Sequence, residues 1–408
     1  MTSEPVGGLR ILVVPAKPWP CDHPMLETVF AKILPARGHR VEWVMWTDRT
    51  DGVDATWHDS LVHLTPLRTG SAVAVVNRWL RLLMRMYRIA RSERFDMIQV
   101  RNSSAAGLAA IAIRRATGIP FAFQASFPVA EWTTEAARRG DVRAPALRRI
   151  AAGLQRALRT SLIRRADLVL AISDRMRDDL VRDGAAANRI VVFPLGTDDP
   201  PEPDTGAVRS LRSELGLGDG LLILYVGSIS PQRELAFLVH VAAIVAERHP
   251  AARWMLVGPS SNGEDELLRR EVARAGLADR FDIHRAVPRT EVPSFLALSS
   301  LTVSPIPPVP IYLVSSPSKT VESLAAGRPV VATAIPDQQT VVRESGGGVI
   351  APYRPDAFAD AISALLDNPQ QRAAMGAAGR DWVREHRSYE GLATLLEHAY
   401  VEAIRKRR

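Results

Sequence analysis

The sequence is poor in cysteine and in long apolar runs. Its 408 residues contain one cysteine, Cys21, which cannot form an intramolecular disulfide or a cysteine-built zinc site. A membrane-spanning helix needs about 20 consecutive apolar residues, and no run of that length occurs. Residues 1–10 also lack the apolar core of a secretory signal. We therefore expect a cytoplasmic protein from a reducing compartment, able to touch a membrane without crossing it.

Aromatic residues and lysine are also scarce. Aromatic residues make up 6% of the chain, and only four of its 52 basic residues are lysine. Residues 1–200 hold 29 basic and 20 acidic residues, and residues 78–165 alone hold 18 arginines and five acidic residues. Such a patch favours an anionic partner such as lipid headgroups, although a general bias toward arginine gives the same count. With few aromatic residues among the arginines and no recognition motif, no nucleic-acid partner is expected.

Short apolar runs alternate with helical patterns along the whole chain. With 47% hydrophobic residues the chain can bury cores, which excludes global disorder. Strands that alternate with helices predict parallel sheets covered on both faces. Residues 198–206 are polar and rich in proline, which predicts a linker between two domains. The expected strands of the first half are 10–15, 41–44, 95–100, 121–124, 166–172 and 190–193, and those of the second half include 221–226, 253–257, 281–284, 301–304 and 329–332.

The segment 315–332 carries the strongest chemical signal. Ser316 and Pro317 predict the cap and the first position of a helix, whose N-terminal N–H groups form a site for phosphate. Lys319 and Glu322 are three residues apart and share one helix face. This pair suits a nucleotide ligand, because the lysine cation can bind a diphosphate and the carboxylate can bind a ribose diol. The alternative is a surface ion pair of little energetic consequence.

Two strand-end glycines add a second signal. Gly227 ends an apolar strand in the run LYVGSISPQREL, and a glycine there lets a ligand approach the backbone. Arg233 follows near a helix start and suits a phosphate because its guanidinium donates two parallel hydrogen bonds. Gly258 ends the next strand in the same way. These positions predict a ligand site at the carboxyl ends of the strands.

Together these segments resemble the retaining glycosyltransferases of family 4. The resemblance runs over nearly the whole chain, and its most specific block is Lys319-x-x-Glu322 with the run AAGRPVV after it. It implies the GT-B fold: two Rossmann-like parallel-sheet domains that face a central cleft. The implied parts are an acceptor-binding domain (1–198), a linker (199–219), a nucleotide-sugar-binding domain (220–386) and a C-terminal helix (387–408) that crosses back to the first domain. Further matching blocks are 34–41, 166–173, 189–198, 346–350 and 357–366.

The resemblance also implies a hexosyltransferase that takes its sugar from a UDP- or GDP-sugar. Glu322 would bind the ribose, and Arg233 and Lys319 would neutralise the leaving diphosphate. Retention of the anomeric configuration would follow from attack on the same face, assisted by the leaving phosphate. No metal or other cofactor is expected, since no Asp-x-Asp stands at a strand end. The other implied donor-site residues are Gly227, Ser228, Gly258, Ser318 and Thr320, with Ala286 and Val287 at the nucleobase.

The sequence departs from the family pattern in three places. Eight residues before Glu322, where many relatives carry a second glutamate, stands Val314. After the strand-end glycine, where the family usually has an arginine, stands Ser228. Arg233 must therefore supply more of the charge that binds the phosphate. The family histidine expected just after 121–124 is absent. These departures keep open a non-catalytic binding or scaffold protein on the same fold, and a nucleotide-sugar 2-epimerase is a further alternative.

The acceptor side carries weaker signals. The acceptor would be a glycan or a polyprenyl-diphosphate-linked sugar in the assembly of a cell-surface polysaccharide or glycoconjugate. Within residues 77–88 an arginine stripe beside a tryptophan predicts a helix at an anionic inner-membrane surface, unless the helix simply packs on its sheet with its arginines in water. The stripe consists of Arg78, Arg81, Arg85 and Arg88 beside Trp79, and the acceptor-site candidates are His23, Ser126, Glu131 and Trp132.

Overall fold

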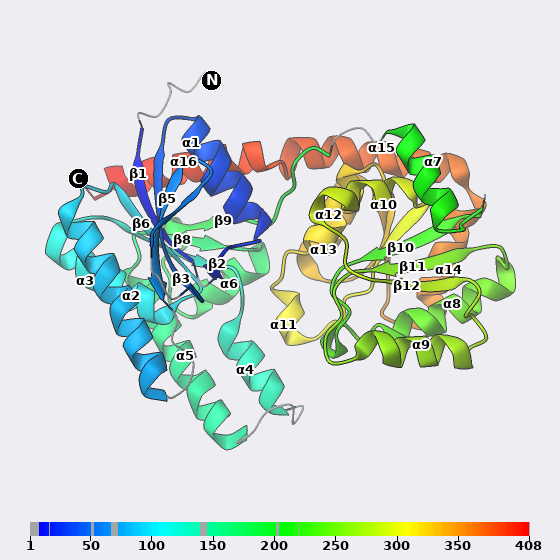
Figure 1. Cartoon of the computed structure of the whole chain (residues 1–408), viewed down its shortest axis with the longest axis horizontal. Helices are drawn as coiled ribbons and strands as arrows, with labels where there is room; N and C mark the ends of the chain where they lie inside the picture. The colour runs from blue at the N-terminus through cyan, green and yellow to red at the C-terminus, as the bar shows by residue number, and fades with distance from the viewer. Residues whose placement is uncertain are drawn as a thin grey trace. The chain divides into compact units, whose positions relative to one another are not determined.

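The computed structural model describes residues 8–15, 17–49, 53–66, 72–138, 145–200, 204–218 and 220–407. The chain forms two compact units (Figure 1). Unit 1 is built from Met1–Pro194 and Tyr389–Arg408, and unit 2 from Leu195–Ser388. The change from one unit to the other therefore comes between Pro194 and Leu195. The sequence predicts it a few residues later, at residue 198.

Unit 1 is built on a mostly parallel sheet in the order β4-β5-β3-β1-β6-β7-β8-β9, with β2 beside β3. Only the β4–β5 pair among these strands is antiparallel. The order reverses between β1 and β6, so their carboxyl ends flank the position where open parallel sheets bind ligands. The strands are β1 (Arg10–Val14), β2 (Pro18–Trp19), β3 (Arg40–Thr47), β4 (Ala55–Trp57), β5 (Ser60–Pro66), β6 (Met97–Arg101), β7 (Phe121–Ala125), β8 (Leu168–Ala171) and β9 (Ile190–Val192).

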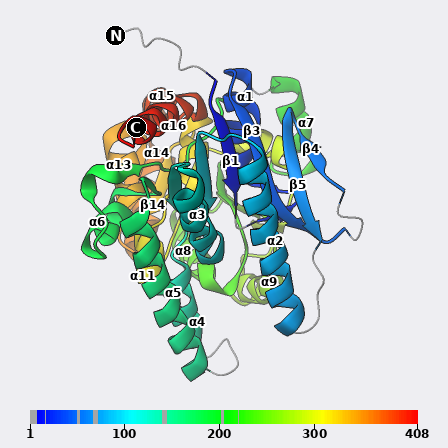
Figure 2. The ribbon, with the colours of Figure 1, turned by 90° about the vertical axis from the view of Figure 1, so that its left-hand side faces the viewer.

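Helices cover both faces of this sheet. Figure 2 shows α2, α3 and α5 side by side in front of it, and α3 contacts both of the others. Ser103 caps α3 because its Oγ accepts from the N–H of Ala106 at 3.2 Å, and Gly118 ends the helix at a φ of +82°. The helical segments are η1 (Leu26–Ile33, a π-helix), α1 (Leu34–Ala36), α2 (Ala72–Ser92), α3 (Ser104–Thr117), α4 (Val129–Arg138), α5 (Pro145–Arg165), α6 (Asp174–Arg182), η2 (Ala187–Arg189) and α16 (Tyr389–Arg405).

The last helix, α16, is held in unit 1 by buried polar contacts. Its Tyr400 hydroxyl donates to Oε1 of Gln99, and both side chains are fully buried. Glu397 binds Arg37 at 2.6 Å and Nε2 of His39 at 2.8 Å. Because buried polar groups are costly when unpaired, α16 is part of the fold of unit 1 and not an appended tail.

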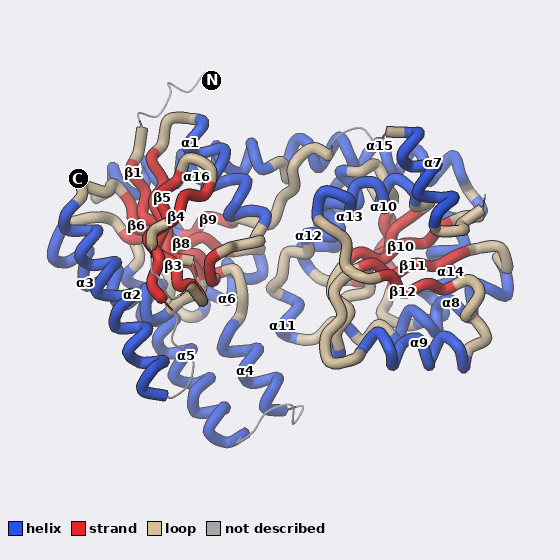
Figure 3. Tube along the Cα trace, viewed as in Figure 1, coloured by secondary structure: helices blue, strands red, loops and turns tan. Residues whose placement is uncertain are grey.

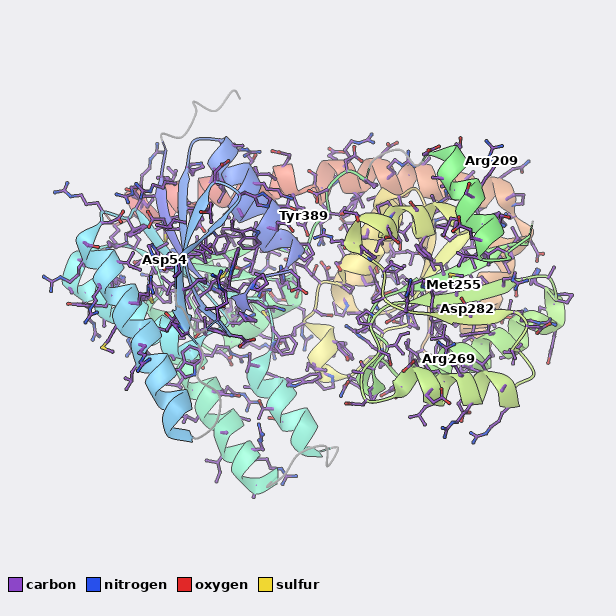
Figure 4. All side chains as sticks on the ribbon, in the orientation of Figure 1. Asp54, Arg209, Met255, Arg269, Asp282 and Tyr389 are labelled. Carbon is purple, nitrogen blue, oxygen red and sulfur yellow. The ribbon has the colours of Figure 1, made fainter. Side chains whose placement is uncertain are left out.

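A charged cluster inside unit 1 makes its stability depend on pH. His63 lies between two carboxylates, with Nε2 at 3.1 Å from Glu42 and Nδ1 at 3.1 Å from Asp54, which Figure 4 labels. Burial acts to lower the pKa of His63, but the hydrogen bonds to Glu42 and Asp54 outweigh it and raise this pKa above its usual value. Protonated His63 therefore stabilises the fold below its usual pKa, and this contribution is lost as the pH rises through the raised value.

We expect His63→Gln to lower the melting temperature at about pH 6 by more than at about pH 9. Thermal unfolding of both proteins across this pH range measures the difference. His398→Gln is the control because His398 is an exposed side chain on α16 of the same unit. A melting-temperature difference that is the same at both pH values would contradict the assignment.

Unit 2 is built on a parallel sheet in the order β12-β11-β10-β13-β14-β15, flanked by helices (Figure 3). The order reverses between β10 and β13. Its strands are β10 (Leu222–Val226), β11 (Arg253–Val257), β12 (Phe281–His284), β13 (Leu301–Ser304), β14 (Val330–Thr333) and β15 (Gly348–Ala351). Its helical segments are α7 (Thr205–Glu214), η3 (Pro231–Arg233), α8 (Ala236–Arg248), α9 (Glu264–Arg274), η4 (Arg289–Glu291), α10 (Val292–Leu298), α11 (Pro310–Leu313), α12 (Ser318–Ala325), α13 (Pro336–Ser345), α14 (Pro355–Asp367) and α15 (Pro369–His386).

The linker expected over 199–219 is wrong in part, because α7 forms within it. Asp204 caps this helix by accepting from the N–H of Gly206 at 2.8 Å. Val208 and Leu211 then pack against the core of unit 2. The density of prolines before residue 204 hides a helix whose cap and apolar positions follow directly after them. Of the helices described, none combines the length and the apolar character that crossing a bilayer requires.

Candidate functional site

Two glycines shape the carboxyl edge of the unit 2 sheet at the reversal of strand order. Gly227 follows β10 with a φ of +153°, and its N–H donates to the carbonyl of Val257 at 2.9 Å. A Cβ at Gly227 would lie 3.2 Å from Nζ of Lys319 and 3.1 Å from the Tyr225 hydroxyl. A Cβ at Gly258 would collide with the carbonyl oxygen of Gly227. Glycine at 227 therefore leaves room for the Lys319 ammonium, and glycine at 258 lets the two strand ends lie close together.

Lys319 holds its ammonium over the ring of Tyr225. Nζ lies 4.3 Å from the ring centroid and donates to the Tyr225 hydroxyl at 3.1 Å. Burial, together with the nearby charge of Arg233, lowers the pKa of Lys319 well below its usual value, although Glu322 acts in the opposite direction. The alternative interpretation, a surface ion pair between Lys319 and Glu322, is not supported, since no ion pair joins these two described residues. The ammonium thus has an aromatic ring and a hydroxyl as neighbours.

Arg233 adds a second cation close by. Its Nε donates to Oγ of Ser228 at 3.4 Å, and its guanidinium lies 5.1 Å from the ring centroid of Tyr312. Among the described residues, no carboxylate forms an ion pair with Arg233. Two cations without an acidic partner at one edge of a sheet suit a dianionic ligand such as a diphosphate.

The α12 N-terminus lies at the same edge, but its start differs from the prediction. The cap residue is Pro317 and not Ser316, and no side chain caps the helix. Ser316 is instead buried, where its Oγ accepts from the N–H of Leu195 at 3.1 Å and from Arg387 at 3.4 Å. The first N–H groups of α12 remain without a side-chain cap, so the helix N-terminus adds positive potential beside Lys319.

A buried polar network fixes α12 against the sheet. Gln338 on α13 is fully buried, and its Oε1 accepts from Ser304 at 2.6 Å and from Thr320 at 2.8 Å. Its Nε2 donates to the carbonyl of Thr333 at 2.8 Å. The Thr320 hydroxyl, which the sequence assigns to the donor site, is therefore engaged in this network.

We expect Gln338→Leu to lower the free energy of unfolding by about 2–4 kcal/mol, because it leaves buried hydroxyls of Ser304 and Thr320 without an acceptor. Chemical denaturation measures this loss. Gln339→Leu, the half-buried neighbour on the same helix, is the matched control and should change stability far less. Equal losses for both variants would show that the network does not stabilise the unit.

Glu322 completes this side of the site. Burial raises the pKa of Glu322, although Arg289 and Lys319 partly offset this effect. Its carboxylate has no hydrogen-bond or ion-pair partner within the described ranges. A half-buried carboxylate without a protein donor is suited to accept hydrogen bonds from a pair of ligand hydroxyls.

The remaining donor-site candidates differ in their surroundings. Ser228 lies against Tyr225, whose hydroxyl donates to its carbonyl at 3.1 Å. Ser318 is half-buried in the first turn of α12. Ala286 is exposed just beyond β12, and Val287 packs against the core. Val314, where relatives carry a glutamate, is buried at 7% exposure. Across the described parts of the chain, no three His, Cys, Asp or Glu side chains gather as a metal site.

In unit 1 the structure separates the four acceptor candidates into two pairs. His23 follows β1 and Ser126 follows β7, so both lie at the carboxyl edge of the sheet. Glu131 and Trp132 lie on α4 instead. Glu131 binds Arg159 at 3.0 Å, and Trp132 packs on Phe127 with ring centroids 5.8 Å apart. Glu131 is thus held in an ion pair between α4 and α5.

An aromatic cavity of about 240 Å³ lies near the same edge of unit 1. Trp46, near the end of β3, and Trp79, on α2, meet edge to face with centroids 5.8 Å apart. The cavity was not predicted, because its members come from distant segments. Within β3, side chains alternate between the two faces of the sheet, so Trp46 lies on the face opposite to Trp43. The apolar lining includes Trp46, Trp79, Phe123, Phe127 and Val129.

The predicted arginine stripe on α2 is wrong for Arg85, and its neighbour Trp79 is also engaged within the unit. Arg85 turns inward, where it donates to the carbonyl of Leu64 and to Asp54. Trp79 packs on Trp46 and does not face solvent freely. Arg85 leaves the stripe because the segment 54–66, where no strand was predicted, supplies both of its partners. The side chain of Arg78 lies outside the described residues, and Arg81 and Arg88 are exposed beside Leu80, Met84 and Tyr87.

Comparison with known proteins decides the family. A model described as "Glycosyltransferase Family 4" matches residues 29–199, and one described as "Glycosyl transferases group 1" matches residues 220–368. The D-inositol 3-phosphate glycosyltransferase of Frankia alni is 30% identical over 291 residues, which cover 67% of this chain and 67% of that protein. The chain belongs to glycosyltransferase family 4.

Two further comparisons, one with a sequence relative and one with a solved structure, describe what this family 4 chain is similar to. The D-inositol 3-phosphate glycosyltransferase of Streptomyces griseus subsp. griseus is 29% identical over 285 residues, so the match covers 64% of this chain and only 57% of that protein. HepE from Anabaena, solved in complex with UDP, aligns with 97% of this chain and 100% of its own, with a TM-score of 0.72 and 16% identity. At this identity the likeness shows the fold, and the predicted GT-B class is confirmed.

Proposed function

We propose that this family 4 protein is a retaining glycosyltransferase that transfers a hexose from a UDP- or GDP-sugar. The observation that carries the proposal is the convergence of Lys319, Arg233 and the α12 N-terminus at the unit 2 sheet edge. Neither cation has a carboxylate partner among the described residues, so both can bind a diphosphate. The relatives named as glycosyltransferases and the UDP bound to HepE support the same reading.

Each donor-site residue has a distinct role in the proposed reaction. Glu322 accepts hydrogen bonds from the ribose hydroxyls. Arg233 and Lys319 bind the diphosphate, and both interactions strengthen as negative charge develops on the leaving oxygen. Gly227 and Gly258 keep the strand ends open, so that the diphosphate reaches the ammonium. The acceptor hydroxyl attacks the face that the diphosphate leaves, and a phosphate oxygen takes its proton, which retains the anomeric configuration.

The two cations also supply the charge neutralisation that a divalent metal provides in other enzymes. We therefore expect turnover without added metal, and turnover that EDTA leaves unchanged. Loss of activity in EDTA that Mg²⁺ or Mn²⁺ restores would overturn this part of the proposal.

Donor binding and turnover test the proposal in two steps. UDP-, GDP- and ADP-sugars are compared by thermal unfolding, since a ligand that binds only the folded state raises the melting temperature. The preferred donor is then incubated with acceptors, and NMR of the product reports the anomeric configuration. An inverted product would overturn the mechanism, and no stabilisation by any nucleotide sugar would overturn the donor site.

A second candidate, a non-catalytic binding protein, has one observation in its favour. Position 314, where the family pattern has a glutamate, is occupied by a buried valine. Donor binding without turnover for any acceptor would support it. Release of UDP without a glycosylated product would instead favour the 2-epimerase alternative.

On the acceptor side, the proposal is a glycan or lipid-linked sugar used at an anionic membrane in cell-surface glycan assembly. Exposed apolar residues gather on α2 and α5, where Leu80 and Met84 are each 50% exposed and Ile150 is 70% exposed. The exposed Arg81 and Arg88 flank them on α2. Apolar side chains with arginines beside them suit the interface of an anionic bilayer.

We expect Leu80→Ser combined with Met84→Ser to reduce co-sedimentation with phosphatidylglycerol vesicles at least fivefold, because it removes the apolar contact with the bilayer. Leu267→Ser is the matched control, since Leu267 is 53% exposed on α9 of the other unit. If both proteins bind vesicles like the wild type, α2 is not a membrane-facing helix.

A further inference from the structure

The carboxyl edge of the unit 1 sheet carries a second cationic position, at the reversal of strand order. Arg101 is the last residue of β6, and His23 lies between β2 and η1, in the segment that follows β1. These two strands are neighbours, and the chain continues away from them on opposite sides of the sheet. Ligands of open parallel sheets bind at this kind of position, so both side chains stand where a ligand is expected.

Arg101 is a buried guanidinium without an acidic partner. Its exposure is 6%, and its Nε is buried without a hydrogen-bond partner. Among the described residues, no carboxylate forms an ion pair with it. Burial lowers its pKa to about 10, and the nearby Cys21 offsets this only in part. By contrast Arg387, at 7% exposure, binds Asp337 at 2.6 Å.

The neighbours of Arg101 that the structure describes are a histidine and a cysteine. Its Nη2 lies 2.8 Å from Nε2 of His23. Since a guanidinium only donates, His23 accepts here and is neutral, with its proton on Nδ1. Burial raises the pKa of the nearby Cys21 thiol, which keeps that group neutral as well. A buried cation surrounded by neutral groups opposes folding unless a ligand supplies the missing charge.

The backbone next to Arg101 is fixed in an unusual conformation. Asn102 has a φ of +53°, which a non-glycine residue rarely adopts. Its Oδ1 accepts from the N–H groups of Ser126 and Phe127 at 2.8 and 3.2 Å, and its Nδ2 donates to Oγ of Ser126 at 2.8 Å. These contacts join the ends of β6 and β7 and hold Arg101 in place before any ligand binds.

We infer that Arg101, positioned by His23 and Asn102, binds an oxyanion, a phosphate or carboxylate group, carried by the acceptor. The assignment of the anion to the acceptor rests on the proposed glycosyltransferase function; the anion site itself does not. Binding would place two guanidinium N–H donors against two anion oxygens. The acceptor would then carry its negative charge apart from the hydroxyl that receives the sugar.

Thermal unfolding in phosphate tests the site. We expect inorganic phosphate to raise the melting temperature of the wild type, and Arg101→Gln to weaken this response at least tenfold in phosphate concentration. Sodium acetate at equal ionic strength tests the carboxylate in the same way. Phosphate could also enter the donor site, so Arg233→Gln is the matched variant. A response that Arg233→Gln removes and Arg101→Gln keeps would overturn the inference.

Stability without any oxyanion gives an independent readout. Arg101→Gln removes an uncompensated buried charge, so its melting temperature should equal or exceed that of the wild type in chloride buffer. Arg387→Gln should lower it, because Asp337 then stays buried without its partner. If Arg101→Gln falls as far as Arg387→Gln, Arg101 is structural and the inference fails.

Two further experiments identify the source of the anion. They also distinguish a failure of the anion site from a failure of the proposed function. Glucose 6-phosphate represents a soluble acceptor, and phosphatidic acid vesicles represent a lipid headgroup. Stabilisation by the first, or co-sedimentation with the second, supports the site when Arg101→Gln abolishes it. The response to UDP should persist in Arg101→Gln; if the wild type responds to phosphate but not to UDP, the donor assignment fails and the anion site stands.

Discussion

Replacing Lys319 by methionine is expected to lower kcat/KM for the nucleotide sugar about 10²–10³-fold, the cost of removing one preorganised charge from a leaving group. Methionine fills most of the space over the Tyr225 ring, where Nζ now lies 4.3 Å from the centroid. It cannot donate to the diphosphate. The fall should appear mainly in kcat, because the charge on the leaving oxygen is largest in the transition state.

The same substitution should leave the melting temperature unchanged or raise it. The pKa of Lys319 is lowered in the folded protein, so its charged form opposes folding at neutral pH, and this cost declines as the pH rises. As the pH is raised, the Lys319 ammonium loses its proton below the usual pKa of lysine. Wild-type activity should therefore begin to fall at a pH below that value. Lys406→Met is the control, since Lys406 is exposed and pairs with Glu402 at 2.6 Å. Near-wild-type turnover in Lys319→Met would reject the donor site.

Glu322→Gln is expected to weaken UDP binding about 10- to 100-fold, because it replaces charged hydrogen bonds to the ribose by neutral ones. Titration calorimetry with UDP measures the effect, and KM should change more than kcat. Glu344→Gln, an exposed residue on α13, should bind UDP like the wild type. Since burial raises the pKa of Glu322, the ionised carboxylate opposes folding, and the amide should raise the melting temperature. Unchanged UDP affinity would remove Glu322 from the ribose site.

The fold class follows from local patterns that the sequence displays directly. Buried parallel strands read as continuous apolar runs, and the run at 10–15 corresponds closely to β1 (Arg10–Val14). The donor-site positions are also local, because a strand-end glycine and a helix N-terminus are each coded within a few residues. Gly227 and Lys319 could therefore be singled out from separate segments, and the structure brings them together.

The features that were missed or wrong depend on contacts between distant segments. Ser316 is a good cap by residue type, but its hydroxyl is bound by Leu195 and Arg387. Arg85 has the spacing of a surface stripe, yet Asp54 in another segment binds it. Nothing local distinguishes Arg101 from the other arginines of the basic half. Its significance lies in its burial without an ion-paired carboxylate among the described residues, which only the fold reveals.

The return of α16 to unit 1 has a consequence for synthesis on the ribosome. Unit 2 lies entirely within residues 195–388, so it can fold once these residues have left the ribosome, without any later segment. Unit 1 is translated first but waits for Glu397 and Tyr400, the partners of His39 and Gln99. The usual order, in which the N-terminal domain folds first during translation, is thus reversed. A released chain that ends at residue 388 should therefore expose unit 1, and not unit 2, to proteases and chaperones.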